Sequence, residues 1–303
     1  MQGAKNNIFN SLLAPFRRPP HAALSRRRIR SWIATKPLLW PCIAIVVGYM
    51  AIALTAPQLS RWGLLGDPVE YLSNPVTVAP SPNYPWGTNQ QGHDVLARTL
   101  HGTRTAFNVV ICGTTFALFF GVPLGLIGGY FGGLLDRILV FAMDALYTLP
   151  GLLLAIAVAY ILQPGITTVS LAVALAYGPL YFRVVRNQAA SIKSRGYVEA
   201  AIAAGSSPIT ILRRHIFPNV LSSLPVLLTL NAADAISMTA SLGFLGLGIP
   251  SDIPEWGHDL RLALDSFAAG SGWWTAVFPG LAITLLITSL SLIGESFGGR
   301  MGS

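Results

Sequence analysis

Long apolar segments constrain the fold of this chain more than any other feature of its sequence. They cover residues 38–56, 105–130, 137–162, 168–181, 216–238 and 275–297. A helix needs about 20 mostly apolar residues to cross the hydrocarbon core of a bilayer. The fourth segment is shorter because Gly178-Pro179 interrupts it, and we expect it to continue to about Arg183. No segment shows the alternation of a transmembrane strand. The sequence therefore predicts an all-α integral membrane protein with six transmembrane helices.

The distribution of positive charge orients these helices. With the N-terminus in the cytoplasm, all of the 20 Lys and Arg residues except Arg61, Arg98, Arg104 and Arg261 fall inside or at the inner boundary. This asymmetry is what the positive-inside rule expects, and it places both termini in the cytoplasm. The distribution of the positive residues therefore explains the net charge of +8 by membrane topology and argues against nucleic-acid binding. The basic stretch 26–30 is interpreted as a topology determinant, with anionic lipid binding as the alternative.

The same reasoning divides the chain into five parts. We expect a basic cytoplasmic tail at 1–37, an uncleaved transmembrane anchor at 38–56, an external loop at 57–104, a five-helix core at 105–297 and a cytoplasmic tail at 298–303. A cleaved signal peptide is disfavoured because 37 residues precede the first apolar segment and Thr55-Ala56-Pro57 is a poor cleavage site. Cys42 and Cys112 lie in predicted spans and indicate neither a disulfide framework nor a metal site.

One cytoplasmic loop, residues 194–219, carries strong local signals. Ala200, Ala201, Ala203 and Ala204 favour a helix without bulk. Gly205 suits a left-handed end of that helix, Ser207 suits an N-cap, and Pro208 suits the first turn of a second helix. The sequence predicts a helix, a sharp turn and a second helix. The alternative interpretation is an amphipathic helix that lies on the membrane surface.

The pattern Glu199-Ala200-Ala201, Gly205, His215 and Pro218 resembles the EAA loop of the membrane subunits of ABC importers. In that family the loop forms a coupling helix that docks on the ATPase subunit. Residues 85–98 resemble a stretch that precedes the core in the dipeptide, oligopeptide and nickel branch of this family, with Asn89 and His93 as departures. Residues 241–257 resemble another stretch of the same branch and predict either a shielded re-entrant turn or an interfacial turn.

The resemblance implies a type I ABC importer permease fold and a C-subunit-like role in the bacterial inner membrane. It implies four kinds of partner: a homologous permease subunit, two ABC ATPase subunits, an external solute-binding protein and the lipid bilayer. ATP and Mg would be bound by the ATPase subunits, and no cofactor is expected in this chain.

The sequence lacks the motifs of the common catalytic sites, which agrees with ATP binding by the ATPase subunits. A phosphate-binding loop needs a lysine after spaced glycines, but none of Lys5, Lys36 and Lys193 follows a glycine. No Ser/His/Asp elbow and no His-Glu-x-x-His motif occurs, and His93 beside Asp94 has no third metal ligand near it. We therefore expect that the chain is not an enzyme and holds no metal.

Polar residues within the spans provide candidates for a transport path. Asn231, Asp234, Ser237 and Ser241 are spaced so that they share a face of the fifth span. They are predicted to line a translocation cavity, and the alternative is hydrogen bonding between subunits. Asp144, with Tyr147 and Thr148 on its face, is interpreted as a structural partner in the third span.

The sequence is compatible with several kinds of cargo. The best single prediction is a di- or oligopeptide delivered by the external binding protein. Nickel or other metal chelates, glutathione and opines are alternatives, and the absence of a soft-ligand cluster disfavours a bare metal ion. A gradient-driven transporter or channel is the alternative from another class, and the sequence shows no matching halves that would favour it.

Overall fold

A computed structural model describes residues 38–70, 74–268, 270 and 272–298 of the 303-residue chain. The predicted tails, residues 1–37 and 299–303, lie outside the described residues. The chain divides into two compact units, Met1–Trp40 and Pro41–Ser303, and the helix bundle lies in the second.

Helices make up the regular structure of the described residues. Their order is α3 (Leu39–Arg61), α4 (Val95–Phe131), α5 (Gly133–Tyr147), α6 (Gly151–Ile161), α7 (Ile166–Lys193), α8 (Gly196–Ala203), α9 (Pro208–Ile211), the π-helical turn η2 (Leu212–Ile216), α10 (Phe217–Leu221), α11 (Leu224–Phe244), α12 (Trp256–Ala268) and α13 (Trp274–Gly298). In this described part, β-pairing is limited to an isolated bridge between Thr88 and Asp94. The predicted all-α class is confirmed.

The predicted third span differs from the structure. Five helices, α3, α4, α7, α11 and α13, are long and apolar enough to cross a membrane. The sixth candidate is the pair α5 and α6, which is bent by 86° at its break, so the prediction of one continuous helix over residues 137–162 was wrong. Pro150 explains the break, because a proline disfavours helical geometry at the residue before it, here Leu149.

Three predicted helix ends also differ from the structure. Helix α4 begins ten residues before the predicted start at residue 105, because Asp94 caps it by accepting hydrogen bonds from the backbone N–H groups of Leu96 and Ala97. Helix α11 begins at Leu224 and not at residue 216, since residues 216–223 belong to the end of η2, to α10 and to a short turn. Helix α7 extends well beyond the predicted 168–181 at its C-terminal end.

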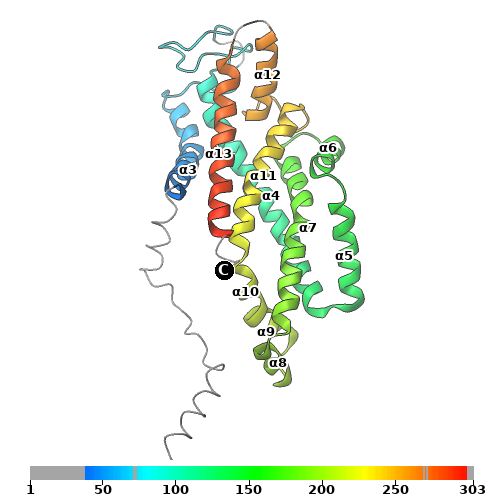
Figure 1. Ribbon diagram of the computed structural model, residues 1–303. Helices are drawn as coiled ribbons and strands as arrows, with labels where there is room; N and C mark the ends of the chain where they lie inside the picture. The colour runs from blue at the N-terminus through cyan, green and yellow to red at the C-terminus, as the bar shows by residue number, and fades with distance from the viewer. Residues whose placement is uncertain (1–37, 71–73, 269, 271, 299–303) are drawn as a thin grey trace, which may run out of the picture. The chain divides into compact units, whose positions relative to one another are not determined.

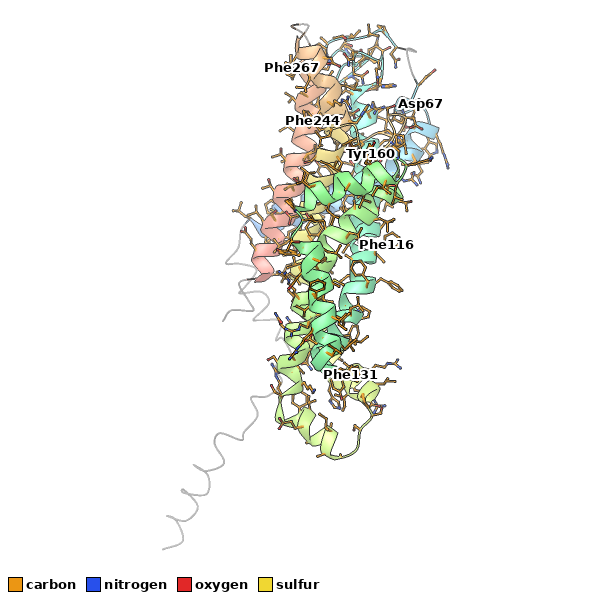
Figure 2. All side chains as sticks on the ribbon, turned by 90° about the vertical axis from the view of Figure 1, so that its right-hand side faces the viewer. Asp67, Phe116, Phe131, Tyr160, Phe244 and Phe267 are labelled. Atoms are coloured by element: carbon orange, nitrogen blue, oxygen red, sulfur yellow. The ribbon has the colours of Figure 1, made fainter. Side chains whose placement is uncertain are left out.

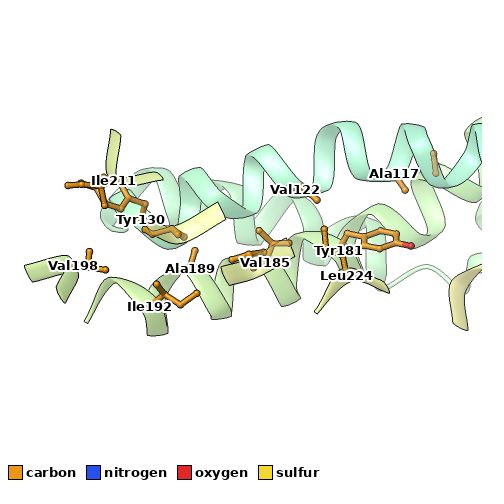
Figure 3. Packing of buried hydrophobic residues seen from close by; sticks show 13 residues of the cluster. Ala117, Val122, Tyr130, Tyr181, Val185, Ala189, Ile192, Val198, Ile211 and Leu224 are labelled. Carbon is orange, nitrogen blue, oxygen red and sulfur yellow. The ribbon is translucent and has the colours of Figure 1, made fainter. Parts of the chain in front are cut away.

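The centre of the bundle is the contact between α4 and α7. Gly121, Gly125 and Gly129 follow one face of α4, and a Cβ at Gly121 or Gly125 would meet α7 backbone oxygens at 2.8 and 2.7 Å. Small residues let two membrane helices approach this closely. Ala117, Val122, Tyr181, Val185 and Ala189 fill the interior along this contact (Figure 3).

The connections gather at the two ends of this bundle. Helix α12 and the segment that precedes α4 lie at one end, and α8, α9 and α10 lie at the other (Figure 1). Helix α13 runs beside α11 and packs on it. The face formed by α4, α5 and α6 carries outward-pointing apolar side chains, among them Phe116 of α4 and Tyr160 of α6 (Figure 2). Two features on this scaffold have the chemistry of a functional site.

Candidate functional site

The first feature is the segment α8–α10, whose turn follows the sequence prediction. Helix α8 ends where the Ser206 N–H donates to the Ala201 carbonyl at 3.1 Å and Gly205 adopts a φ of +78°. Ser207 then caps α9, since its hydroxyl accepts from the Thr210 N–H at 3.3 Å, and Pro208 occupies the first turn. The predicted helix, left-handed glycine and N-cap are therefore confirmed as local structure.

Buried apolar side chains anchor this segment to the bundle. Val198, Ile211 and Ile216 are fully buried and join the cluster that lies along α7. Part of the surface that remains is apolar, with Ala200, Ala203, Ile202 and Ile209 exposed. Ile202 and Ile209 were not singled out in the sequence analysis, because the pattern there emphasised alanines. An exposed apolar surface of this kind at the end of a bundle is suited to contact with another protein.

The remaining predicted residues of this loop have different environments. Glu199 is exposed in the first turn of α8, where a carboxylate interacts favourably with the helix dipole. His215 is half-buried, 6.1 Å from the Tyr197 ring centre to centre, and its carbonyl accepts from the Asn219 amide at 2.6 Å. Pro218 lies in the first turn of α10, directly after the π-helical turn.

The second feature is a cavity of about 660 Å³ between α5, α6, α7 and α11. Its polar wall contains Asp234, Ser237 and Ser241 of α11, together with Tyr147 of α5 and Tyr177 of α7. Asp234 is exposed to this space. The two tyrosines were not predicted as cavity residues, because their placement depends on the bend between α5 and α6 and on how α7 packs.

Asn231, the fourth predicted path residue, is not brought into this cavity. Its side chain is buried at 4% exposure, and its Nδ2 has no hydrogen-bond partner among the described residues. Each residue turns an α-helix by about 100°, and Asn231 lies six residues before Ser237. The two side chains therefore point in directions about 120° apart. The predicted polar face is therefore wider than the cavity it was expected to line.

The end of the bundle that carries α12 contains a buried charged cluster that sequence reasoning missed. Arg98 of α4 and Asp259 of α12 form an ion pair of 2.7 Å with side-chain exposures of 2% and 7%. Glu255 caps α12 by accepting from the Gly257 and His258 N–H groups at 2.8 and 2.7 Å. Burial raises the pKa of Glu255 to about 8 and lowers the pKa of His258.

This cluster holds α12 against α4 and α11. Gly243 must lack a side chain, because a Cβ there would collide with the Glu255 carboxylate. The Trp256 indole N–H donates to the Thr99 carbonyl at 2.8 Å and ties α12 to α4. His93 and Asn89 belong to the turn before α4, where the Asn89 side chain accepts from the His93 N–H at 2.9 Å. Within the described ranges, no three His, Cys, Asp or Glu side chains converge as metal ligands.

Asp144 takes part in an ion pair within the chain. Its carboxylate lies 2.6 Å from the Arg183 guanidinium of α7, which also lies over the Tyr147 ring at 4.2 Å. Asp144 thus has a structural partner within this chain.

Comparison with known proteins places these features in a family. Residues 121–303 match the family described as binding-protein-dependent transport system inner membrane component. The dipeptide transport system permease protein DppC of Alkalihalophilus pseudofirmus is 34% identical over 253 residues, which cover 84% of this chain and 81% of that protein. The glutathione transport system permease protein GsiD of Pectobacterium atrosepticum is 33% identical over 278 residues, covering 92% and 89%.

A solved structure agrees on the fold. A chain of the MetNI methionine ABC transporter in an inward-facing conformation superposes with a TM-score of 0.53 and 18% sequence identity. The match covers 69% of this chain and 95% of that one. At this level of identity the similarity concerns the arrangement of helices alone.

Proposed function

Because this chain belongs to the family of binding-protein-dependent transport system inner membrane components, we propose that it forms half of a translocation path for small peptides. It is a multi-pass permease subunit of an ABC importer in the inner membrane. Such subunits are not catalytic and hold no cofactor, and this family assignment decides against a gradient-driven transporter.

The observation that carries the proposal is the combination of a polar cavity and an exposed apolar surface on the same bundle. The cavity between α5, α6, α7 and α11 offers one carboxylate and several hydroxyls in an otherwise apolar span. Dispersed polar groups of this kind bind a cargo weakly enough for its release. A homologous permease subunit would close the open side of this cavity and complete the path.

The coupling segment α8–α10 would transmit the action of the ATPases. We propose that Ala200, Ala201 and Ile202 contact the ATPase subunit, with Glu199 beside them and Gly205 setting the turn. His215 and Pro218 would hold the segment that returns to α11. ATP and Mg would be bound by two ATPase subunits, and both termini of this chain would lie in the cytoplasm.

Small peptides are the proposed cargo, with glutathione as the second candidate. The relatives reported above are a dipeptide and a glutathione permease, and both compounds carry ammonium and carboxylate groups. Asp234 would meet the ammonium group in the cavity. Metal chelates and opines are weaker candidates than small peptides and glutathione, since no feature of the cavity favours them.

Replacing Asp234 by Asn tests the proposal, because this change keeps the shape of the side chain and removes its charge. The assay is uptake into proteoliposomes that contain this chain, its partner permease, the ATPases and the loaded binding protein. Uptake of a zwitterionic dipeptide should fall about tenfold, the loss expected for one charged hydrogen bond, while the complex stays assembled. Thr55→Ala, which removes an exposed hydroxyl on α3 outside this cavity, is the control. Loss of the complex in detergent would identify Asp234 as an assembly residue and refute its role in the path.

A further inference from the structure

Arg183 is a charged residue of the spanning helix α7 that the proposed path has not yet used. It pairs with Asp144 of α5 at 2.6 Å, and the two side chains are 39% and 46% exposed. A charge this exposed within a span is costly if it faces lipid. The pair therefore faces water or protein, which is the environment of a transport path.

The hydrogen bonding of Arg183 leaves it free to bind a second partner. Its Nε and Nη2 both donate to one oxygen, Asp144 Oδ1, at 3.2 and 2.6 Å. A guanidinium has five N–H donors, so most of those on Arg183 remain available, and its Nη1 bonds no described residue.

Arg186, one turn further along α7, differs in this respect. It meets Asp136 with a two-oxygen fork, Nε to Oδ1 at 2.8 Å and Nη2 to Oδ2 at 2.5 Å. Its Nη1 donates to the Asn187 side chain at 3.1 Å. Each of the three nitrogens of the Arg186 guanidinium thus makes a hydrogen bond, and two of them hold α5 to α7, whereas Nη1 of Arg183 makes none with the described residues.

Arg183 also lies between two cavities. The cavity that contains Asp234 is lined by Tyr147 and by Leu180 of α7, and Arg183 stacks on that tyrosine. A second polar cavity of about 510 Å³ begins at Asn187 and Gln188 and extends to Ser222 and Ser223. Leu180, Arg183 and Asn187 are spaced i, i+3 and i+7, so they follow one side of α7. A cargo that moves from the first cavity to the second along this side passes Arg183.

We propose that Arg183 binds the carboxylate of the cargo between the two cavities, and that Asp144 keeps this contact transient. The inference rests on the proposed function, because it requires that the cargo is transported along α7. A guanidinium and a carboxylate form a planar two-bond pair, which suits the C-terminus of a peptide. Asp144 competes for the same guanidinium, so the cargo is released when the path opens further. A zwitterion would meet Asp234 with its amine and Arg183 with its carboxylate.

The test measures how strongly transport depends on the cargo's carboxylate. The complete transporter is reconstituted in proteoliposomes, and uptake of Ala-Ala is divided by uptake of its C-terminal amide, each at saturation of the binding protein. The preference of the binding protein itself is the same for every variant and cancels in the comparison. Arg183→Gln should lower this ratio about tenfold relative to the wild type, as expected for loss of a charged hydrogen bond. Arg186→Gln, the matched control, should not lower it.

A merely structural ion pair predicts a different result. In that case Arg183→Gln and Asp144→Asn would reduce uptake of both probes alike and leave the ratio unchanged, and this outcome overturns the inference. If Arg183→Gln does not assemble, Arg183→Lys keeps a positive charge for Asp144 but loses the fork. Its ratio should fall about threefold, and an unchanged ratio overturns the inference. A wild-type complex that takes up neither probe overturns the proposed peptide cargo, and the inference with it.

Discussion

At the scale of single residues, Gly205 determines the shape of the coupling segment. Its φ of +78° costs a residue with a side chain about 1–2 kcal/mol, and a β-branched residue more. A Cβ at this position would meet no neighbouring atom, so the strain is one of backbone conformation and not of space. The effect of a substitution here is therefore separable from a packing defect.

In Gly205→Val the valine would be strained at this φ, and a shift of α8 relative to α9 would relieve that strain. The surface proposed to contact the ATPase would then be displaced. Uptake by the reconstituted complex should fall several-fold while membrane insertion is retained. Gly196→Ala is a matched control, because Gly196 also has open space around it and has no positive φ. Wild-type uptake by the Gly205→Val protein would contradict the role given to this turn.

Glu255 should make the stability of the folded protein depend on pH. Its pKa of about 8 in the fold exceeds the ordinary value of 4.5, so the folded state holds a proton that the unfolded state has released. Stability contributed by this group is complete below pH 4.5 and is lost as the pH rises to 8. His93 and His258 act in the opposite direction, since their lowered pKa values reduce stability as the pH falls through about 6.5.

Between pH 7 and 8.5 only the Glu255 contribution changes among these three groups. The unfolding temperature of the detergent-solubilised protein should therefore fall across this range. Glu255→Gln removes the titrating group, and its unfolding temperature should change less over the same interval. A steeper fall in Glu255→Gln than in the wild type would show that another group controls stability there.

At the scale of elements, proline explains two interruptions of the helices. Pro150 separates α5 from α6, and Pro218 follows the π-helical turn η2. Proline has no N–H, and its ring clashes with the carbonyl four residues earlier, here Arg214. The Phe217 N–H bonds the Leu212 carbonyl five residues back, which is the wider spacing of a π turn.

Replacing Pro218 by Ala should allow this turn to tighten into a regular helix. The register between the coupling segment and α11 would change, so ATP hydrolysis and uptake should become less tightly coupled. The measurement is the number of ATP molecules hydrolysed per cargo molecule, which should rise in Pro218→Ala. Pro225→Ala is the control, because Pro225 lies in the first turn of α11 and interrupts no helix. An unchanged ratio would mean that η2 has no part in coupling.

At the scale of the whole molecule, the two ends of the bundle should face opposite sides of the membrane. The segment before α4 and helix α12 lie at one end, and α8–α10 lie at the other. In a background without Cys42 and Cys112, Asn83→Cys should react with an impermeant thiol reagent on intact cells. Ser194→Cys, at a position that is also exposed, should react only after permeabilisation. The reverse pattern would overturn the orientation and the ATPase-docking proposal together.

The sequence by itself determined the helical class, the approximate spans and the turn at Gly205, because these depend on local signals. Apolar length, the distribution of Lys and Arg, and capping residues act within a few residues of where they occur. The family was equally visible in short contiguous motifs such as Glu199-Ala200-Ala201.

Tertiary structure alone decided which residues meet. Nothing local places Tyr147 and Tyr177 beside Asp234, pairs Arg98 with Asp259, or turns Asn231 away from the cavity. These outcomes depend on the bend at Pro150 and on the angles at which α4, α7 and α11 pack. Helix packing is a sum of many weak contacts between segments far apart in the chain, so no single stretch of sequence encodes it.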